Sequence, residues 1–349
     1  AYEISTLLEF RRVLFRSIAT DDLDGAQADL AAIPDPAALS FVALIYASFA
    51  AEAADDLDSA LVFAEHMVEA AGASDLAASL ARRGRLLFLL DDNARAKADL
   101  ERAALLDPEE GEAWAGLAAL ALETDPAQAV LLYRRALDID PDDAAYAYGL
   151  AEALFWSGDY EGAEASYGSL VKRYPDDAEM HASWAATLVR LERFEEAERP
   201  SARAVALAPD NPEYRLIRGE ALYLLGEADG ALEQMDRLAA AGADTAYSRY
   251  VAAVIRRNKG DYEAALREAD AGLALAPDDA DLMEEKGGVY YMLDDPLSAR
   301  EWLDKALVIN PNLAGALFVR GLVRAELGDA EGADRKSTRL NSSHVLSSY

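Results

Sequence analysis

Alanine recurs along this chain at a fixed interval of 34 residues, at seven positions that run from Ala129 to Ala333. Proline follows most of these alanines twelve residues later, at Pro141, Pro175, Pro209, Pro277 and Pro311. A fixed interval of this length is typical of repeat architectures, in which each unit buries its apolar face against its neighbours. The interval therefore predicts an elongated array of similar units without one central core.

The segment from Ala144 to Pro175 shows what one unit contains. It has two helical patterns separated by a turn at Gly158-Asp159. Glycine supplies the left-handed residue that ends a first helix, and the following acid suits the positive start of a second helix. Pro175 ends that second helix, and the aspartates after it cap the next one. A 34-residue helix-turn-helix unit of this kind resembles the tetratricopeptide repeat family, and the resemblance covers most of the chain.

This resemblance implies an all-α fold, a right-handed α-solenoid (superhelix) of tandem 34-residue helix-turn-helix units. The two ends of the chain do not fit the repeat, are locally basic, and resemble translated sequencing-adapter read-through in metagenomic reading frames. We interpret residues 1–17 and 335–349 as artefact outside the fold. Residues 18–334 then divide into a half unit at 18–35, units at about 41–72, 77–108, 111–141, 144–175, 178–209, 212–243, 246–277 and 280–311, and a partial unit at 314–334.

Two positions in each unit are expected to be small because helices must approach closely there. One is the recurring alanine of the second helix, where leucine should overpack the interface. The other is the eighth position of the first helix, occupied by Gly84, Ala118, Ala151, Ala185, Gly219, Ala253, Gly287 and Gly321. Pro200 breaks the pattern because it falls inside a second helix, and we expect a kink or a late start of that helix.

The composition narrows the classes of partner. The formal net charge is −31, which argues against binding to nucleic acid backbones. An acidic surface is compatible with solubility alone, with salt adaptation, or with a basic partner, and these interpretations stay open. No 18-residue apolar run is present, so no membrane span is expected. Cysteine is absent, which leaves the compartment open, with a cytoplasmic location favoured and a periplasmic one possible if a signal peptide has been lost.

The sequence offers little for catalysis or cofactor binding. The three histidines, His66, His181 and His344, are far apart in the sequence. A single histidine on a helix is usually a surface or core residue and not a metal ligand. The acidic loop at Asp21 lacks the ligand pattern of a calcium site. No phosphate-binding glycine loop and no nucleophile elbow are present. We therefore expect a protein that is not an enzyme and that has no cofactor and no metal site.

With catalysis and cofactor binding not expected, the remaining class of function is binding of another protein or peptide. In the tetratricopeptide family the first helices line a concave groove, and the resemblance implies that positions 2, 5, 9, 12 and 13 of each unit face it. The candidate groove residues are Phe88, Tyr148, Glu152, Phe155, Trp156, Arg190, Glu220, Tyr223, Tyr247, Tyr250, Arg257 and Tyr291. Position 12 is aromatic in every second unit, at Phe88, Phe155, Tyr223 and Tyr291. These rings either contact an extended peptide or pack between neighbouring helices, and the sequence leaves both open.

The function expected from the resemblance is a non-catalytic scaffold that binds a partner protein or an extended peptide, with a basic or aromatic-rich partner favoured. The groove positions are largely aromatic or acidic, which argues against the family members that clamp a C-terminal carboxylate with basic residues. The alternative is the repeat arm of a larger protein, either a glycosyltransferase or a periplasmic module for polysaccharide export or assembly. No direct insertion into a membrane and no nucleic acid partner are expected.

Overall fold

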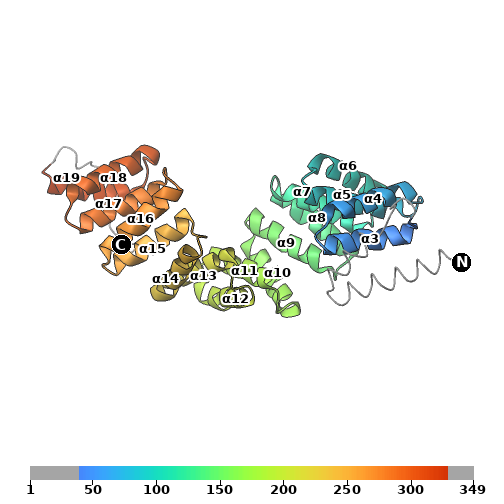
Figure 1. Cartoon of the computed structure of the whole chain (residues 1–349), viewed down its shortest axis with the longest axis horizontal. Coiled ribbons are helices and arrows are strands. Elements are labelled where there is room, and N and C mark those ends of the chain that lie inside the picture. Colours follow the sequence, from blue (N-terminus) through green and yellow to red (C-terminus); the bar gives the residue numbers. More distant parts are fainter. Residues whose placement is uncertain (1–38, 329–349) are drawn as a thin grey trace. The chain divides into compact units, whose positions relative to one another are not determined.

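The computed structural model describes residues 39–328 and is all-α in that range. Residues 1–38 and 329–349, with the expected half unit, the two terminal stretches and His344, lie outside the described part. The chain divides into two compact units at Arg173 and Tyr174. Figure 1 shows the helices of both in chain order.

The described part of the first unit, residues 39–173, contains four antiparallel helix pairs. The two helices of each pair pack on each other. The pairs are α3 (Phe41–Ala53) with α4 (Leu57–Ala70), α5 (Leu76–Leu89) with α6 (Asn93–Leu106), α7 (Gly111–Leu122) with α8 (Pro126–Ile139), and α9 (Ala144–Ser157) with α10 (Tyr160–Arg173).

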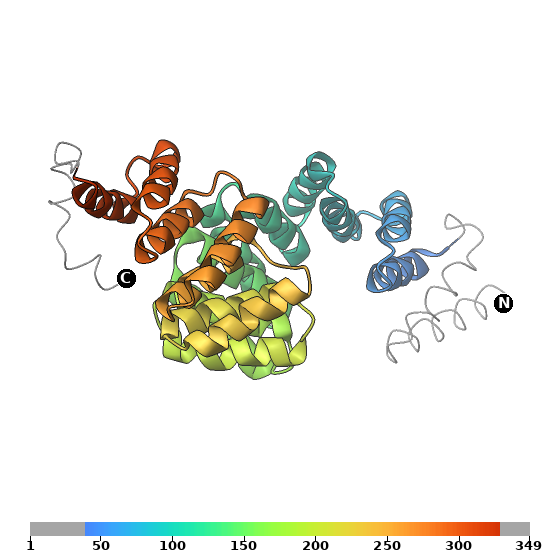
Figure 2. The same ribbon diagram turned by 60° about the vertical axis from the view of Figure 1, so that its left-hand side comes forward.

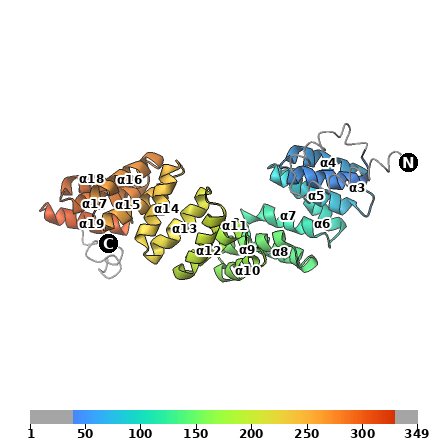
Figure 3. The same cartoon turned by 60° about the horizontal axis from the view of Figure 1, so that its bottom comes forward.

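Between residues 174 and 328 the second unit also consists of helix pairs, four in number, followed by one further helix (Figure 2). The pairs are α11 (Ala178–Arg190) with α12 (Phe194–Leu207), α13 (Pro212–Leu225) with α14 (Ala228–Ala240), α15 (Ala246–Asn258) with α16 (Tyr262–Leu275), and α17 (Ala280–Met292) with α18 (Pro296–Ile309), followed by α19 (Ala314–Glu326). Within each unit the first helices also contact the first helices of neighbouring pairs, as α5 does α7 and as α15 does α17 (Figure 3). The first helices therefore form a layer in each unit.

Aspartates set the starts of most helices. Asp143 accepts a hydrogen bond from the backbone N–H of Tyr146 at 2.9 Å, and Asp279 does the same for Leu282 at 2.9 Å. Both bonds satisfy one of the unpaired N–H groups of a first turn. Several first helices end in a left-handed residue, which is glycine at Gly158 but Glu192 or Asp294 elsewhere, with φ of 57° and 61°. The turn is therefore kept even where glycine is missing, at a steric cost.

The recurring alanines lie at the centres of the helix contacts. Those from Ala129 to Ala299 are all 0% exposed, and Ala333 lies outside the described residues. The glycines at the eighth position, like the recurring alanines, leave no room for a larger side chain. A Cβ added to Gly287 would lie 2.7 Å from Leu303 Cγ, and one added to Gly84 would lie 2.7 Å from Leu100 Cγ. Both kinds of slot are small because the neighbouring helix occupies the space, as the sequence predicts.

The expectation of a late start at Pro200 is wrong. Helix α12 begins at Phe194 and continues to Leu207 with Pro200 inside it. Pro200 is buried with Ala197 and Ala204, and α12 packs on both α11 and α13. This packing outweighs the roughly 3 kcal/mol that an internal proline costs a helix, so the helix is kept.

Candidate functional site

An aromatic group lies at the C-terminal end of α9 in the first unit. Phe155 makes edge-to-face contacts with Trp156 and with Tyr160, each with 5.4 Å between ring centroids. Phe155 is half-buried, whereas Trp156 is 64% exposed. A tryptophan held by a neighbouring ring presents a large contact area at a low cost in conformational entropy.

The other candidates of the first unit take part in packing. Tyr148 is half-buried and contacts Tyr167 of α10 edge-to-face, with 5.8 Å between ring centroids. Phe88 is also half-buried and packs against the cluster of Leu87, Ala96 and Leu100. The rings of Tyr148 and Phe88 therefore have one side in the core and one side partly open. Glu152 is half-buried on α9.

In the second unit the candidates from α13 and α15 come together. Tyr247 is 39% exposed, and its hydroxyl donates a hydrogen bond to Glu220 Oε1 at 3.2 Å. Tyr223 and Tyr250 are half-buried and pack against a cluster that includes Val251. The structure thus brings residues from two consecutive repeats onto one surface.

The pKa values of these tyrosines show what surrounds them. Burial raises the pKa of Tyr247, and the carboxylate of Glu220 raises it further. Burial is also the largest cause of the raised pKa of Tyr250, and the other causes are Glu285, Tyr223, Glu284 and Asp281. Charges shift a pKa only from nearby, so the phenols and carboxylates of α13, α15 and α17 share one neighbourhood.

The remaining candidates of the second unit are Tyr291 and Arg190. Tyr291 is half-buried on α17 and packs against the cluster of Leu303 and Val319. Arg190 is exposed at the end of α11.

Arg257 differs most from the expectation for a groove residue. Its side chain is 4% exposed, and its Nε lies 2.7 Å from Oε1 of Glu285, which is 5% exposed. Burial raises the pKa of Glu285, and Arg257 acts in the opposite direction. Arg257 therefore joins α15 to α17 in the interior of the second unit.

Sequence reasoning missed a matching pair in the first unit. Arg82 of α5 is 1% exposed and forms an ion pair with Glu52 of α3. Its Nε and Nη2 donate to the Oγ and the backbone oxygen of Ser48, at 3.1 and 3.0 Å. In both ion pairs, the residue at position 12 of one repeat contacts the residue at position 6 of the next repeat. The acid is at position 12 in the first unit and at position 6 in the second unit. Opposite charges at these two positions would have been the sequence signal for a contact between the helices.

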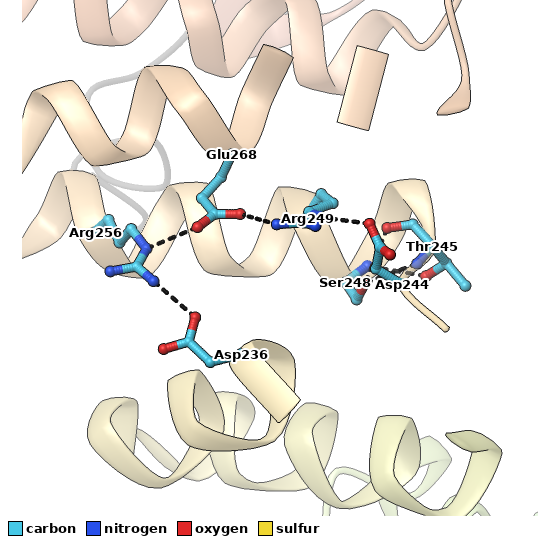
Figure 4. Close-up of polar contacts among 7 residues, drawn as sticks. All are labelled: Asp236, Asp244, Thr245, Ser248, Arg249, Arg256 and Glu268. Carbon is cyan, nitrogen blue, oxygen red and sulfur yellow. Dashed lines mark hydrogen bonds and ion pairs between the residues drawn. The ribbon is translucent and has the colours of Figure 1, made fainter. Parts of the chain in front are cut away.

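A charged network joins the second helices to α15 (Figure 4). Arg249 lies 2.6 Å from Asp244 and 2.6 Å from Glu268, and Arg256 lies 3.1 Å from Glu268 and 2.7 Å from Asp236. Both arginines lie on one face of α15, two turns apart, so Glu268 of α16 reaches both. Because its charges are satisfied within the network, we assign it a structural role.

The histidines are held by neighbours of their own. His66 Nδ1 lies 3.1 Å from Glu69 Oε2, and His181 Nε2 lies 3.0 Å from the backbone oxygen of Pro175. Within residues 39–328 no group of three histidine, cysteine, aspartate or glutamate side chains could hold a metal ion.

The helix pairs define an all-α repeat solenoid, and comparison identifies the family. Models of the tetratricopeptide repeat match residues 77–110, 120–186, 182–246 and 250–314. The chain belongs to the tetratricopeptide repeat family. A comparison with curated proteins found no match.

Two solved structures illustrate the shared fold. The Pseudomonas aeruginosa protein pilF is 20% identical, with 62% of this chain and 100% of that chain covered and a TM-score of 0.54. A tetratricopeptide repeat protein from Parabacteroides merdae is 15% identical, with 71% and 98% covered and a TM-score of 0.54. At these identities the likeness concerns the fold alone.

The family sets the general class of function. Its fold is generally a protein-interaction scaffold, and its members typically bind protein partners without catalysing a reaction. Among the described helices, none is both long enough and apolar enough to span a lipid bilayer.

Proposed function

We propose that this protein is a non-catalytic scaffold that binds a partner protein or an extended peptide on the layer of first helices. The observation that carries the proposal is that the first helices of each unit carry partly exposed aromatic side chains. Trp156 is 64% exposed and Tyr247 is 39% exposed, and each is oriented by a neighbour, Phe155 or Glu220. Residues of this kind dominate the binding energy of many protein interfaces.

The half-buried rings fit the same role. Tyr148, Tyr223 and Tyr291 each have part of the ring in the core, so their position is set before a ligand arrives. A preformed contact surface loses little conformational entropy on binding. The layer of first helices is therefore a suitable surface for an extended ligand in each unit.

The test is selection of short peptides from a random displayed library on the immobilised full chain. The dissociation constants of the selected peptides are then measured for Trp156→Ala and Tyr247→Ala. We expect at least one of these variants to weaken each selected peptide about tenfold, as loss of an aromatic anchor does.

A matched control is Leu131→Ala, because Leu131 is 65% exposed but lies on the second helix α8. It should leave peptide binding unchanged. Equal losses for the control and the test variants would show that the ligand does not use the first helices. Failure to select any peptide above background would contradict peptide binding by this surface.

A further inference from the structure

The first-helix surface of the second unit carries negative charge that the described chain does not neutralise. Glu220 of α13 and Asp281 of α17 form no ion pair within residues 39–328. Burial raises the pKa of Asp281, and neighbouring Asp279 raises it further. Some carboxylates of the same unit are paired, as Asp270 is with Lys286 and Glu268 is with two arginines. Glu220 and Asp281 differ from these carboxylates by their position beside tyrosines.

These carboxylates adjoin aromatic faces. Tyr247 is hydrogen-bonded to Glu220, and Tyr250 lies close enough to Asp281 and Glu284 for both to raise its pKa. Arg257 of α15 is buried and paired with Glu285. We call Glu220, Tyr247, Tyr250 and Asp281 the tyrosine-acid surface. Phenol rings beside carboxylates attract a cation both through the ring quadrupole and through charge.

An exposed apolar side chain adjoins this surface and is independent of its charge. Leu224 at the end of α13 is 39% exposed and lies one helical turn after Glu220. A ligand on the tyrosine-acid surface can therefore make an apolar contact beside Glu220.

We propose that the tyrosine-acid surface binds a positively charged segment of a partner protein, with a lysine or arginine side chain against Tyr247 and between Glu220 and Asp281. An apolar residue of the same segment contacts Leu224. This inference rests on the proposed function and specifies the chemistry of the ligand in the second unit. The charge complementarity favours a basic segment over a neutral or acidic one.

The test uses two short fluorescent peptides of alternating lysine, leucine and alanine, or glutamate, leucine and alanine. Their binding to the full chain is measured by fluorescence anisotropy at low and high salt. We expect the lysine peptide to bind and the glutamate peptide not to bind. Glu220→Gln with Asp281→Asn should weaken the lysine peptide about tenfold, and Tyr247→Leu about threefold or more.

Net charge alone must be separated from a specific surface. The matched control is Glu263→Gln with Glu195→Gln, which removes two exposed carboxylates from second helices of the same unit. It should weaken the lysine peptide less than about twofold, because screened charges at a distance contribute little. Equal weakening by the test pair and the control pair would overturn the inference in favour of non-specific attraction.

The inference and the proposed function can fail separately. If library selection yields acidic or neutral peptides that Tyr247→Ala weakens, the proposed function stands and the basic ligand is excluded. If the lysine peptide binds with unchanged affinity to Tyr247→Leu and to the Glu220/Asp281 variant, the tyrosine-acid surface is not its site. Circular dichroism of each variant verifies that the helices are retained.

Discussion

The buried pair of Arg257 and Glu285 should tolerate exchange of its charges but not loss of one partner. In Arg257→Met the carboxylate of Glu285 would stay 5% exposed without its cation at 2.7 Å. Breaking a buried ion pair in this way typically costs about 3–5 kcal/mol. We expect a loss of that size in the stability of the second unit.

The exchanged pair, Arg257→Glu with Glu285→Arg, should regain most of the lost stability. The first unit supplies the precedent, because Glu52 and Arg82 occupy the same two positions with the charges reversed. We expect the double variant to lie within about 1–2 kcal/mol of the original chain, since the pair is restored but the surrounding packing is not optimised.

The pH dependence of Arg257→Met gives a second readout. The pKa of Glu285 is already raised by burial, and removal of Arg257 takes away the group that lowers it. A raised pKa in the folded state means that the folded chain binds the proton more tightly than the unfolded chain. The variant should therefore recover stability as the pH falls toward the ordinary glutamate pKa of about 4.3, and lose it as the pH rises.

Hydrogen exchange of α15 and α17, together with urea unfolding, is the suitable assay because a repeat array need not unfold in one step. Arg237→Met is the control, since Arg237 pairs with Glu233 on the exposed face of α14, with side chains 59% and 55% exposed. Arg237→Met should leave the hydrogen-exchange rates of α15 and α17 almost unchanged. A loss below about 1 kcal/mol in Arg257→Met, or no recovery in the exchanged pair, would refute this account of the interface.

Three further predictions concern packing, the turns and titration. Ala163→Leu, at a side chain that is 0% exposed, should lower stability by about 1–3 kcal/mol in urea unfolding, and an unchanged midpoint would contradict the tight alanine slot. Glu192→Gly should raise stability by about 0.5 kcal/mol, because glycine relieves the left-handed φ of 57° but adds freedom to the unfolded chain; a lower melting temperature would show that the side chain is needed there. Burial, and next Glu152, raise the pKa of Tyr133 to about 12. The unfolded chain then releases this proton first, so stability should fall by about 2–3 kcal/mol as the pH rises from about 10 to 12. Tyr133→Phe should remove this part of the alkaline loss in urea unfolding, and an identical pH profile would contradict the shift.

The tyrosines of position 12 illustrate a limit of sequence reasoning. Their spacing marks them as special, but spacing cannot separate a ligand contact from a packing contact. The structure shows Tyr223 and Tyr291 half-buried against core clusters, with the rest of each ring open. Both uses are compatible with one ring, so the alternatives that the sequence leaves open are not exclusive.

Pro200 shows the same limit for local propensity. Helix propensity alone predicts a disrupted or late helix, because proline removes a donor and clashes one turn back. The observed helix passes through Pro200 because α11 and α13 pack on either side of it. Propensity is a property of the segment, whereas this packing is a property of three helices.

The sequence by itself determined the helix pairs, their turns and their small contact positions, because these depend on residues within one repeat and recur every 34 residues. Only the tertiary structure decided which side chains of the first helices reach solvent. Arg257 has the position of a groove residue, yet it is buried because Glu285 approaches from the next repeat. Tyr247 stays partly open because its neighbour is Glu220, which keeps the hydroxyl at the surface. Exposure depends on the facing side chain, and that side chain belongs to a different repeat.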